Sequence, residues 1–378
     1  MNLPVQTPLS PPQMAFVLHD AGETRALMPV MSKLDMAGVD YVVLAESTAK
    51  GLLLHDPHRV PSAAEMARAE QNAPRLAAWM KQQWNRALHA SLCVTGLSSD
   101  FQKRWADFFR QNGRRVVGYY DGFGFRLNRE NNPVSGFQAS LTDLITPTAD
   151  SAEHFKRQGF GHIPVSALGQ PTLESIPAAM NQSNPSLLTQ QLVLTPGKPT
   201  ILFVGQYGAD YEQAFALFCQ TAAQLPNANL LVSLHPKANG EFETRMIQQF
   251  GLQGKIQILP KELATEQALL VADMVLTNTS TMATQAFLQG EKVIFVGPKK
   301  ADLYEPLQAR GLAPRCLTPE SLVTAVHHAM QVEQATLPSQ SQLYSLLGIP
   351  HAATERITAY LLSLLPPKQA NPISSETL

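Results

Sequence analysis

The stretch Asp273-Met-Val-Leu-Thr-Asn-Thr-Ser-Thr-Met-Ala-Thr-Gln-Ala-Phe-Leu-Gln-Gly-Glu-Lys-Val-Ile-Phe-Val-Gly297 decides the fold of the second half of the chain. It begins and ends with short apolar runs, at 273–276 and 292–296, which are typical of buried strands. A hydroxyl-rich turn and a helical pattern that Gly290 ends lie between them. A strand, a helix and a second strand in this order predict one unit of a parallel α/β sheet.

The same alternation occurs twice along the chain. We expect further strands at residues 14–18, 41–44, 91–95, 115–119, 143–146, 163–167, 200–204, 230–233 and 255–259. Helices are predicted at 23–36 and 100–112, and a long or broken helix at 62–88 with a kink at Pro74. The fold class predicted is therefore α/β, with two Rossmann-like doubly wound parallel-sheet domains facing an interdomain cleft.

The domain boundaries follow from composition. Residues 175–199 are rich in Asn, Gln, Ser and Pro and predict a linker. We expect an N-terminal domain at 1–174, a C-terminal domain at 200–350, a terminal helix at 351–366 and a flexible tail at 367–378. A chain of 378 residues is too long for one ordinary core, which also favours two domains.

Composition excludes several kinds of partner. The chain has 29 Lys and Arg against 30 Asp and Glu, so no bulk field attracts nucleic acid or an anionic membrane. No apolar run approaches the roughly 20 residues that a transmembrane helix needs. The three cysteines lie far apart and no His, Cys, Asp or Glu residues have zinc-ligand spacing, so we expect reduced thiols, a cytoplasmic protein and no metal.

The hydroxyl-rich turn is the strongest candidate site. Asn278, Thr279, Ser280 and Thr281 stand where a helix begins, and the free N–H groups and dipole of a helix N-terminus bind phosphate. The turn therefore predicts a cradle for a diphosphate. The alternative is that one of these residues simply caps the helix.

Two other loops follow strands of the same half. His235-Pro-Lys237 places an imidazole and an ammonium where they can donate to phosphate oxygens. The alternative there is an ordinary turn with a solvated lysine. Gly205-Gln206-Tyr-Gly follows another strand, and its glycines allow a ligand or the facing domain to approach the backbone.

In order and spacing, these loops resemble the C-terminal domain of GT-B glycosyltransferases, in particular the branch that includes hydrolysing UDP-N-acetylglucosamine 2-epimerase. The resemblance covers residues 200–298 and implies phosphate or base contacts at His235, Thr279, Ser280 and Thr281. Many relatives carry a glutamate that accepts from the ribose hydroxyls, and here Gln285 stands at that position. A glutamine oxygen can accept the same hydrogen bonds without the added strength of a charge.

Loops of the first half supply candidates for a general base. His19, Asp20 and Glu23 follow the first strand and begin a helix, and Asp121 follows the fourth strand among aromatic residues that could stack on a sugar. Asp20 and Glu23 also fit a capping box, and Asp121 before Gly122 also fits a turn. We therefore favour Asp121 over Glu23 as the base.

The function predicted is transfer of a sugar from a nucleotide diphosphate-sugar to an acceptor that the sequence does not identify. It would use no metal and no cofactor. Two alternatives stay open: epimerisation or hydrolysis of the sugar nucleotide, and binding without turnover, which Gln285 favours. Fold alone does not decide among them.

Overall fold

The computed structural model describes residues 11–174, 184–225, 227–331 and 339–366, which form two compact units. The first unit contains the described residues up to Tyr119, together with Gly136–Leu144 and those from Thr354 onward. The second contains Tyr120–Ser135 and the described residues of Ile145–Ala353. The predicted domain boundaries stay predictions, and residues 175–183 of the predicted linker and the predicted tail lie outside the described residues.

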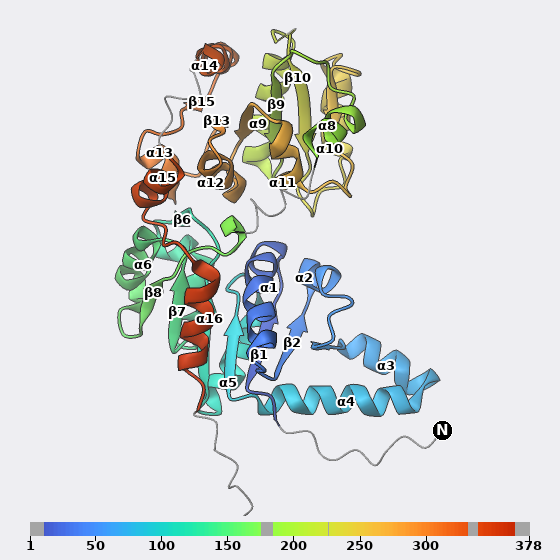
Figure 1. Cartoon of the computed structure of the whole chain (residues 1–378), viewed down its shortest axis with the longest axis vertical. Coiled ribbons are helices and arrows are strands. Elements are labelled where there is room, and N and C mark those ends of the chain that lie inside the picture. The colour runs from blue at the N-terminus through green and yellow to red at the C-terminus, as the bar shows by residue number, and fades with distance from the viewer. Residues whose placement is uncertain (1–10, 175–183, 226, 332–338, 367–378) are drawn as a thin grey trace, which may run out of the picture. The chain divides into compact units, whose positions relative to one another are not determined.

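A seven-stranded sheet has the order β3-β2-β1-β4-β5-β7-β8 (Figure 1). Its strands are β1 Met14–Leu18, β2 Tyr41–Ala45, β3 Arg59–Val60, β4 Leu92–Thr95, β5 Arg115–Tyr119, β7 Asp143–Thr146 and β8 Val165–Ala167. All five residues of β1 are buried, because this strand pairs with a parallel strand on each side and is covered on both faces. The predicted strands of this half are all present.

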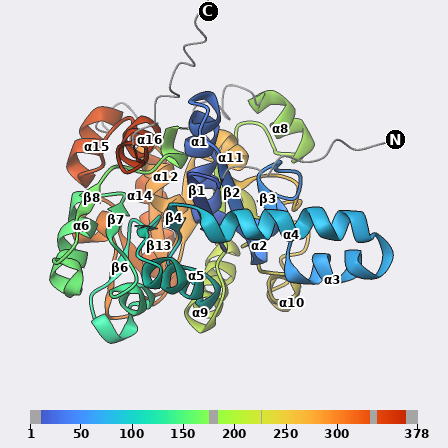
Figure 2. The same cartoon turned by 90° about the horizontal axis from the view of Figure 1, so that it is seen from below.

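The helices of this part of the chain are α1 Ala21–Met36, α2 Ser47–Leu52, α3 Ala63–Asn72, α4 Pro74–His89, α5 Asp100–Gln111 and α6 Ala149–Phe155, with shorter helical turns at Arg129–Asn131, Pro133–Phe137 and Lys156–Phe160. The predicted long or broken helix is two helices, α3 and α4, which lie side by side (Figures 1 and 2). Pro74 is the first residue of α4, a position where its missing N–H costs no hydrogen bond.

A six-stranded parallel sheet has the order β11-β10-β9-β12-β13-β15. Its strands are β9 Thr200–Val204, β10 Asn229–Ser233, β11 Ile256–Ile258, β12 Met274–Thr277, β13 Lys292–Val296 and β15 Arg315–Cys316. The helices around it are α8 Pro185–Gln191, α9 Ala209–Ala222, α10 Glu241–Gln249, α11 Thr265–Ala268, α12 Thr281–Leu288, α13 Pro306–Ala309, α14 Pro319–Gln331 and α15 Gln340–Leu347, with a further turn at Leu269–Val271.

Alternate residues of this second sheet enter two different cores. Leu202 and Val275 belong to one apolar cluster, whereas their neighbours Phe203 and Leu276 belong to another. Because successive side chains of a strand point to opposite faces, the sheet is covered on both sides. This confirms the predicted doubly wound α/β class for the second half.

A short antiparallel pair joins two distant segments of the second unit. Strand β6, Phe125–Arg126, pairs with β14, Leu303–Tyr304. An ion pair of 2.6 Å between the Arg126 guanidinium and the Asp302 carboxylate extends the pairing. Neither strand was predicted, because two residues are too few to show a periodic pattern.

The predicted terminal helix is observed as α16, Ala353–Ser363, and it belongs from Thr354 onward to the first unit. The Tyr360 hydroxyl donates to the Asp143 carboxylate at 2.7 Å, and Lys33 of α1 lies 3.1 Å from Glu355. These contacts hold α16 against β7 and α1.

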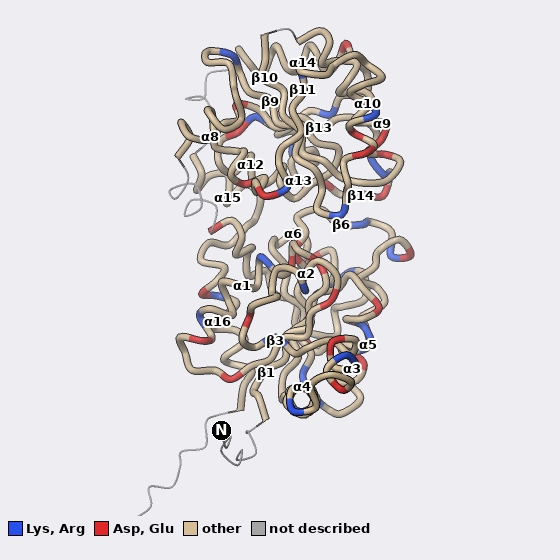
Figure 3. Tube along the Cα trace, turned by 90° about the vertical axis from the view of Figure 1, so that its right-hand side faces the viewer, with Lys and Arg blue, Asp and Glu red and all other residues tan. Residues whose placement is uncertain are grey.

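Charged side chains of both signs are interspersed along the described chain (Figure 3). This distribution agrees with the formal net charge of −1. Among the described residues, no helix combines the length and the apolar character that crossing a membrane demands.

Glu291, beside the start of β13, gives a stability prediction. Burial, followed by the nearby charge of Asp273, raises the pKa of Glu291 from 4.5 to about 8, against the opposing effect of Lys292. A carboxyl group with a folded pKa above its unfolded value binds its proton more tightly when folded, so stability falls as pH rises from about 5 to 8.

Glu291→Gln removes this penalty and should raise the free energy of unfolding by roughly 1–3 kcal/mol at pH 9 while changing little at pH 4. Urea denaturation at both pH values measures the difference. Glu153→Gln, at an exposed residue paired with Lys156, is the control and should show no such gain. Equal effects at the two pH values would contradict the assignment.

Candidate functional site

Both sheets reverse their strand order beside a central strand. In the first sheet β1 lies between β2 and β4, and in the second β9 lies between β10 and β12. Ligands of open α/β sheets bind beyond the carboxyl ends of the strands at such reversals. A ligand is therefore expected at the loops that follow β1 and β4, or at those that follow β9, β10 and β12.

Four loops leave the same edge of the second sheet, because β10, β9, β12 and β13 are parallel neighbours. Three are the predicted binding loops at residues 205–208, 235–237 and 278–281, and the fourth comprises residues 297–299. The structure thus brings the predicted nucleotide residues of these three loops to one edge.

Gly205 is required by the end of β10. Its N–H donates to the Ser233 carbonyl at 2.7 Å, and a Cβ atom on Gly205 would lie 2.7 Å from that same oxygen. The close approach that the glycine permits is therefore to a neighbouring strand. Beyond it, Gln206 is half-buried and the Tyr207 side chain is 61% exposed.

The ring of His235 has a defined hydrogen-bonding direction. The backbone N–H of Lys237 donates to Nδ1 of His235 at 3.1 Å. In a neutral imidazole only one nitrogen carries the proton, so this contact places it on Nε2 and makes Nε2–H a donor. The Tyr207 ring packs edge-on against His235 at 4.7 Å, and the Lys237 ammonium lies 5.9 Å from the centre of the Tyr207 ring.

Within the hydroxyl-rich turn, Ser280 is the residue that caps α12. Its hydroxyl accepts from the N–H of Met282 at 3.2 Å. Thr281 is the first helical residue and is exposed, and Thr279 is half-buried. The capping alternative is therefore confirmed for Ser280, and the phosphate contacts at these residues stay predictions.

Asn278 is engaged within the fold. Its side chain is 3% exposed, and Nδ2 donates to the carbonyls of Val296 at 2.9 Å and Pro298 at 2.7 Å. Its Oδ1 accepts from the hydroxyl of Thr279 at 2.9 Å. Asn278 thus fastens the turn after β12 to the loop after β13. The predicted nucleotide contact of Asn278 is untested by this arrangement.

Gln285 lies on α12 one turn beyond the cap and is 6% exposed. Its Nε2 donates to the Thr172 hydroxyl at 3.1 Å. Its buried Oε1 has no hydrogen-bond partner among the described residues. A buried acceptor without a partner is costly, and a donor from a ligand would remove that cost.

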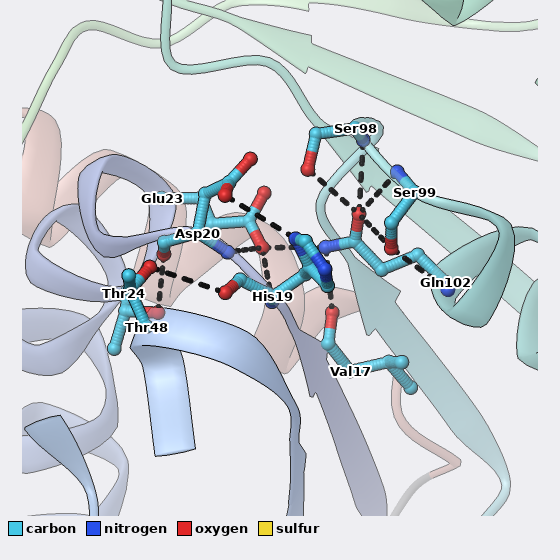
Figure 4. A network of polar contacts seen from close by, with 9 residues as sticks. All are labelled: Val17, His19, Asp20, Glu23, Thr24, Thr48, Ser98, Ser99 and Gln102. Carbon is cyan, nitrogen blue, oxygen red and sulfur yellow. Dashed lines mark hydrogen bonds and ion pairs between the residues drawn. The ribbon is translucent and has the colours of Figure 1, made fainter. Parts of the chain in front are cut away.

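In the first unit, the Glu23 carboxylate organises the loop after β1 (Figure 4). Glu23 is 3% exposed and accepts from the N–H groups of His19 at 2.6 Å and Asp20 at 3.1 Å, in the predicted capping box. It also accepts from Nε2 of Gln102 at 2.5 Å. The network in Figure 4 therefore connects the loops after β1 and β4 through one carboxylate.

His19 and Asp20 differ from Glu23 in exposure. Their side chains are 21% and 31% exposed, and Nδ1 of His19 lies 3.2 Å from the Asp20 carboxylate. A carboxylate beside one imidazole nitrogen orients the ring and supports proton transfer at the other. This pair is the better general-base candidate of the first unit, because Glu23 already accepts three hydrogen bonds.

Gly96 leaves no room for a side chain beside this network. A Cβ atom there would lie 1.7 Å from Oε2 of Glu23 and 2.4 Å from Nε2 of Gln102. Gly96→Ala would push the Glu23 carboxylate out of its hydrogen bonds, so we expect a loss of about 1–3 kcal/mol in the free energy of unfolding. Denaturant unfolding measures it.

Gly51→Ala is the matched control, since nothing lies within 4 Å of its added Cβ atom and it occupies a helical position of α2. It should stabilise the protein by about 0.4–1 kcal/mol through the unfolded chain. A Gly96→Ala variant as stable as Gly51→Ala would show that the Glu23 network is dispensable.

Asp121 belongs to the second unit, as the predicted nucleotide loops do. Its carbonyl accepts from Nε2 of Gln170 at 2.8 Å, and Gln170 is 3% exposed. The residues two positions further along are also held in place. Thr172, which follows Gln170, contacts Gln285, and Phe123, which follows Asp121, is 1% exposed within the core of this unit. Asp121 therefore lies on a backbone that buried contacts hold.

The prediction that aromatic residues around Asp121 stack on a sugar is wrong for three of them. Tyr119 and Phe123 are each 1% exposed. Phe125 is 5% exposed and stacks on His154 at 4.1 Å and on Tyr304 at 4.5 Å. Rings that are buried in this way serve the core and leave no face for a ligand.

Three residues of these networks were absent from the predicted sites. Gln102 binds Glu23, Thr172 binds Gln285, and Tyr207 packs on His235. Thr172 and Gln102 act on residues more than 70 positions away in the chain, so no local pattern could connect them. Tyr207 could have been found, because it stands inside a predicted loop.

Comparison with known proteins gives similarity at the level of structure. No family model matches the chain, and no curated protein matches its sequence. Among solved structures, a co-structure of S. aureus MnaA with UDP has a TM-score of 0.67 at 12% identity, over 95% of this chain and 99% of that chain.

Two other structures show the same likeness. UDP-GlcNAc 2-epimerase from Neisseria meningitidis, bound to UDP-GlcNAc, has a TM-score of 0.66 at 11% identity, over 93% of this chain and 99% of that chain. A glycosyltransferase from Rickettsia africae has a TM-score of 0.59 at 11% identity, over 93% of this chain and 99% of that chain. The chain therefore has the GT-B fold, and within it resembles the UDP-N-acetylglucosamine 2-epimerase structures.

Proposed function

We propose that the chain is an enzyme that binds a nucleotide diphosphate-sugar at the carboxyl edge of its second sheet and transfers the sugar to an acceptor. The observation that carries the proposal is that two donors lie at the same edge of the second sheet, after the strands on either side of β9. One donor is the N-terminus of α12, which begins at this edge and is capped by Ser280. The other is Nε2–H of His235, in the loop after β10. Both can donate hydrogen bonds that stabilise the negative charge developing on a departing diphosphate, without a metal.

The nucleotide that we propose is UDP. Similar structures contain UDP or UDP-GlcNAc, and the buried Oε1 of Gln285 can accept from a hydroxyl group of the ribose. This contact satisfies an acceptor that has no partner among the described residues. Its geometry would depend on the Thr172 hydroxyl, which holds the other end of the Gln285 amide.

For the acceptor proton we propose Asp121, with the His19–Asp20 pair as the competing base. Asp121 is half-buried on a backbone that Gln170 fixes. Either group could remove a proton from an acceptor hydroxyl as it attacks the sugar. We propose a structural role for Glu23, because its carboxylate accepts hydrogen bonds from three donors.

The binding step has a direct test. UDP should raise the melting temperature much more than uridine does, because the diphosphate contacts carry most of the affinity. A ligand at 100 times its dissociation constant adds about 2.7 kcal/mol to stability, which a thermal-shift measurement resolves. GDP, CDP and dTDP serve as comparisons for the base. Equal shifts with UDP and uridine would overturn the diphosphate site.

A second reaction, epimerisation, is favoured by the likeness to the 2-epimerase structures. It requires removal of a proton from a sugar carbon, so incubation of UDP-GlcNAc in heavy water would exchange that hydrogen for deuterium without an added acceptor. Transfer instead releases UDP only when an acceptor is present. Tight UDP-sugar binding with neither reaction would identify a protein that binds without turnover.

A further inference from the structure

Arg315, the first residue of β15, donates to three acceptors at the edge of the second sheet. Its Nη2 binds the Asn278 carbonyl at 2.9 Å and its Nη1 binds the Gly297 carbonyl at 2.8 Å. Its Nε binds Oε1 of Gln308 at 3.1 Å, and the guanidinium lies 5.0 Å from the centre of the Phe295 ring. One side chain thus contacts the loops after both β12 and β13.

The contact between Arg315 and the Asn278 carbonyl also fixes the direction of the neighbouring Thr279 N–H. The C=O of Asn278 and the N–H of Thr279 belong to one planar peptide, and no peptide bond of the described chain is cis. In a trans peptide these two groups point in opposite directions. Holding the Asn278 oxygen therefore directs the Thr279 N–H away from the guanidinium.

The Thr279 N–H has no hydrogen-bond partner within the described parts of the chain. The side chain of Asn278 reinforces the arrangement, since it holds the carbonyls of Val296 and Pro298 on either side of Gly297. Gly297 leaves no room for a side chain, because a Cβ atom on it would lie 2.8 Å from the backbone of Ala214. Arg315 and Asn278 thus contact the loop after β13 at three consecutive carbonyls, those of Val296, Gly297 and Pro298.

Arg315 is charged at neutral pH, even though its side chain is half-buried. Burial lowers the pKa of Arg315 to about 10, while the nearby Glu305 opposes that shift. Glu305 is 6% exposed, and burial raises the pKa of its carboxyl group to about 7. At neutral pH the guanidinium is therefore charged. It binds the carbonyl of the same peptide group that contains the Thr279 N–H.

We propose that Arg315 is a positioning residue of the diphosphate site, holding the Asn278 carbonyl so that the Thr279 N–H is presented to a phosphate oxygen. The inference rests on the proposed function of that site. It adds a residue from β15, about 35 positions beyond the hydroxyl-rich turn, to the parts of the chain that determine phosphate affinity.

Calorimetry on the whole protein tests this role with three probes: UDP, inorganic pyrophosphate and uridine. Arg315→Gly should weaken UDP and pyrophosphate by about tenfold or more, a factor that 1.4 kcal/mol produces, and leave uridine within twofold. Guanidinium chloride at a non-denaturing concentration should restore part of the UDP affinity. Arg315→Lys should weaken UDP less, because an ammonium keeps the charge but not the fork that reaches two carbonyls.

Arg59→Ala is the control, since Arg59 forms a comparable two-contact pair with Glu65 in the other unit. It should neither weaken UDP nor respond to guanidinium. If circular dichroism shows that Arg315→Gly is unfolded, the test relies on Arg315→Lys. Wild-type UDP affinity in Arg315→Lys would then overturn the inference. Equal weakening of UDP and uridine also overturns it. A wild-type protein that binds neither UDP nor pyrophosphate refutes the proposed function itself.

Discussion

Asp121→Asn should lower the rate of sugar transfer by about 10²–10⁴-fold, the contribution that a positioned general base makes. The dissociation constant of UDP should change little, since the carboxylate acts on the acceptor proton and the diphosphate is bound by other loops. The amide is nearly the same size as the carboxylate, so the backbone held by Gln170 is retained. A donor-consumption assay together with calorimetry separates the two effects.

Glu23→Gln is the comparison variant for this prediction. Its carboxylate is buried and accepts from three donors, so its loss should mainly reduce stability. His19→Gln is the third arm. If His19→Gln abolishes turnover and Asp121→Asn does not, the base is the His19–Asp20 pair. Loss of UDP binding in Asp121→Asn would show that Asp121 belongs to the donor site.

His235→Ala should weaken UDP binding by about 10–100-fold, equivalent to roughly 1.4–2.7 kcal/mol from one charge-assisted contact. The reason is the tautomer that the structure imposes. The Lys237 N–H donates to Nδ1 of His235, which places the proton of the neutral ring on Nε2, the nitrogen that can donate to a phosphate oxygen. Calorimetric titration with UDP measures the change.

Two isosteres test the direction of that donor. The amide of His235→Gln can place a nitrogen near the position of Nε2, whereas that of His235→Asn reaches only to the position of Nδ1. We therefore expect Gln to retain more UDP affinity than Asn. His162→Ala, at an exposed histidine whose Nδ1 contacts the Gly159 carbonyl, should leave binding unchanged. Full UDP affinity in His235→Ala would return His235 to the status of a loop residue.

The strands were predictable because their signal is local. Five residues of β1 and five of β9 are buried on both faces, and continuous apolar runs of this length leave few alternatives. Strands β3, β6, β14 and β15 were not predicted. Each has two residues, and its pairing depends on a partner that lies elsewhere in the chain.

The candidate site was predictable in position but not in detail. Loops after parallel strands meet at one edge, so 205–208, 235–237 and 278–281 could be grouped from their order alone. What each side chain does depends on distant partners. The nucleotide contact of Asn278 stays a prediction, but the sequence could not show that its amide also holds the carbonyls of Val296 and Pro298. Likewise, Arg315 could not be assigned, since its acceptors lie on two other loops.

The interleaved make-up of the first unit has a consequence for how the protein is synthesised. That unit includes residues up to Tyr119, but it also includes α16 from Thr354, whose Ile357 and Leu361 are fully buried. A ribosome releases the amino-terminal strands more than 200 residues before this helix emerges. During synthesis, the surface that α16 covers in the finished unit therefore stays exposed until this helix emerges. Contacts between residues so far apart in the sequence also form slowly. A chain truncated before α16 should accumulate as a chaperone-bound or aggregated species even though the loops predicted to bind the nucleotide are intact.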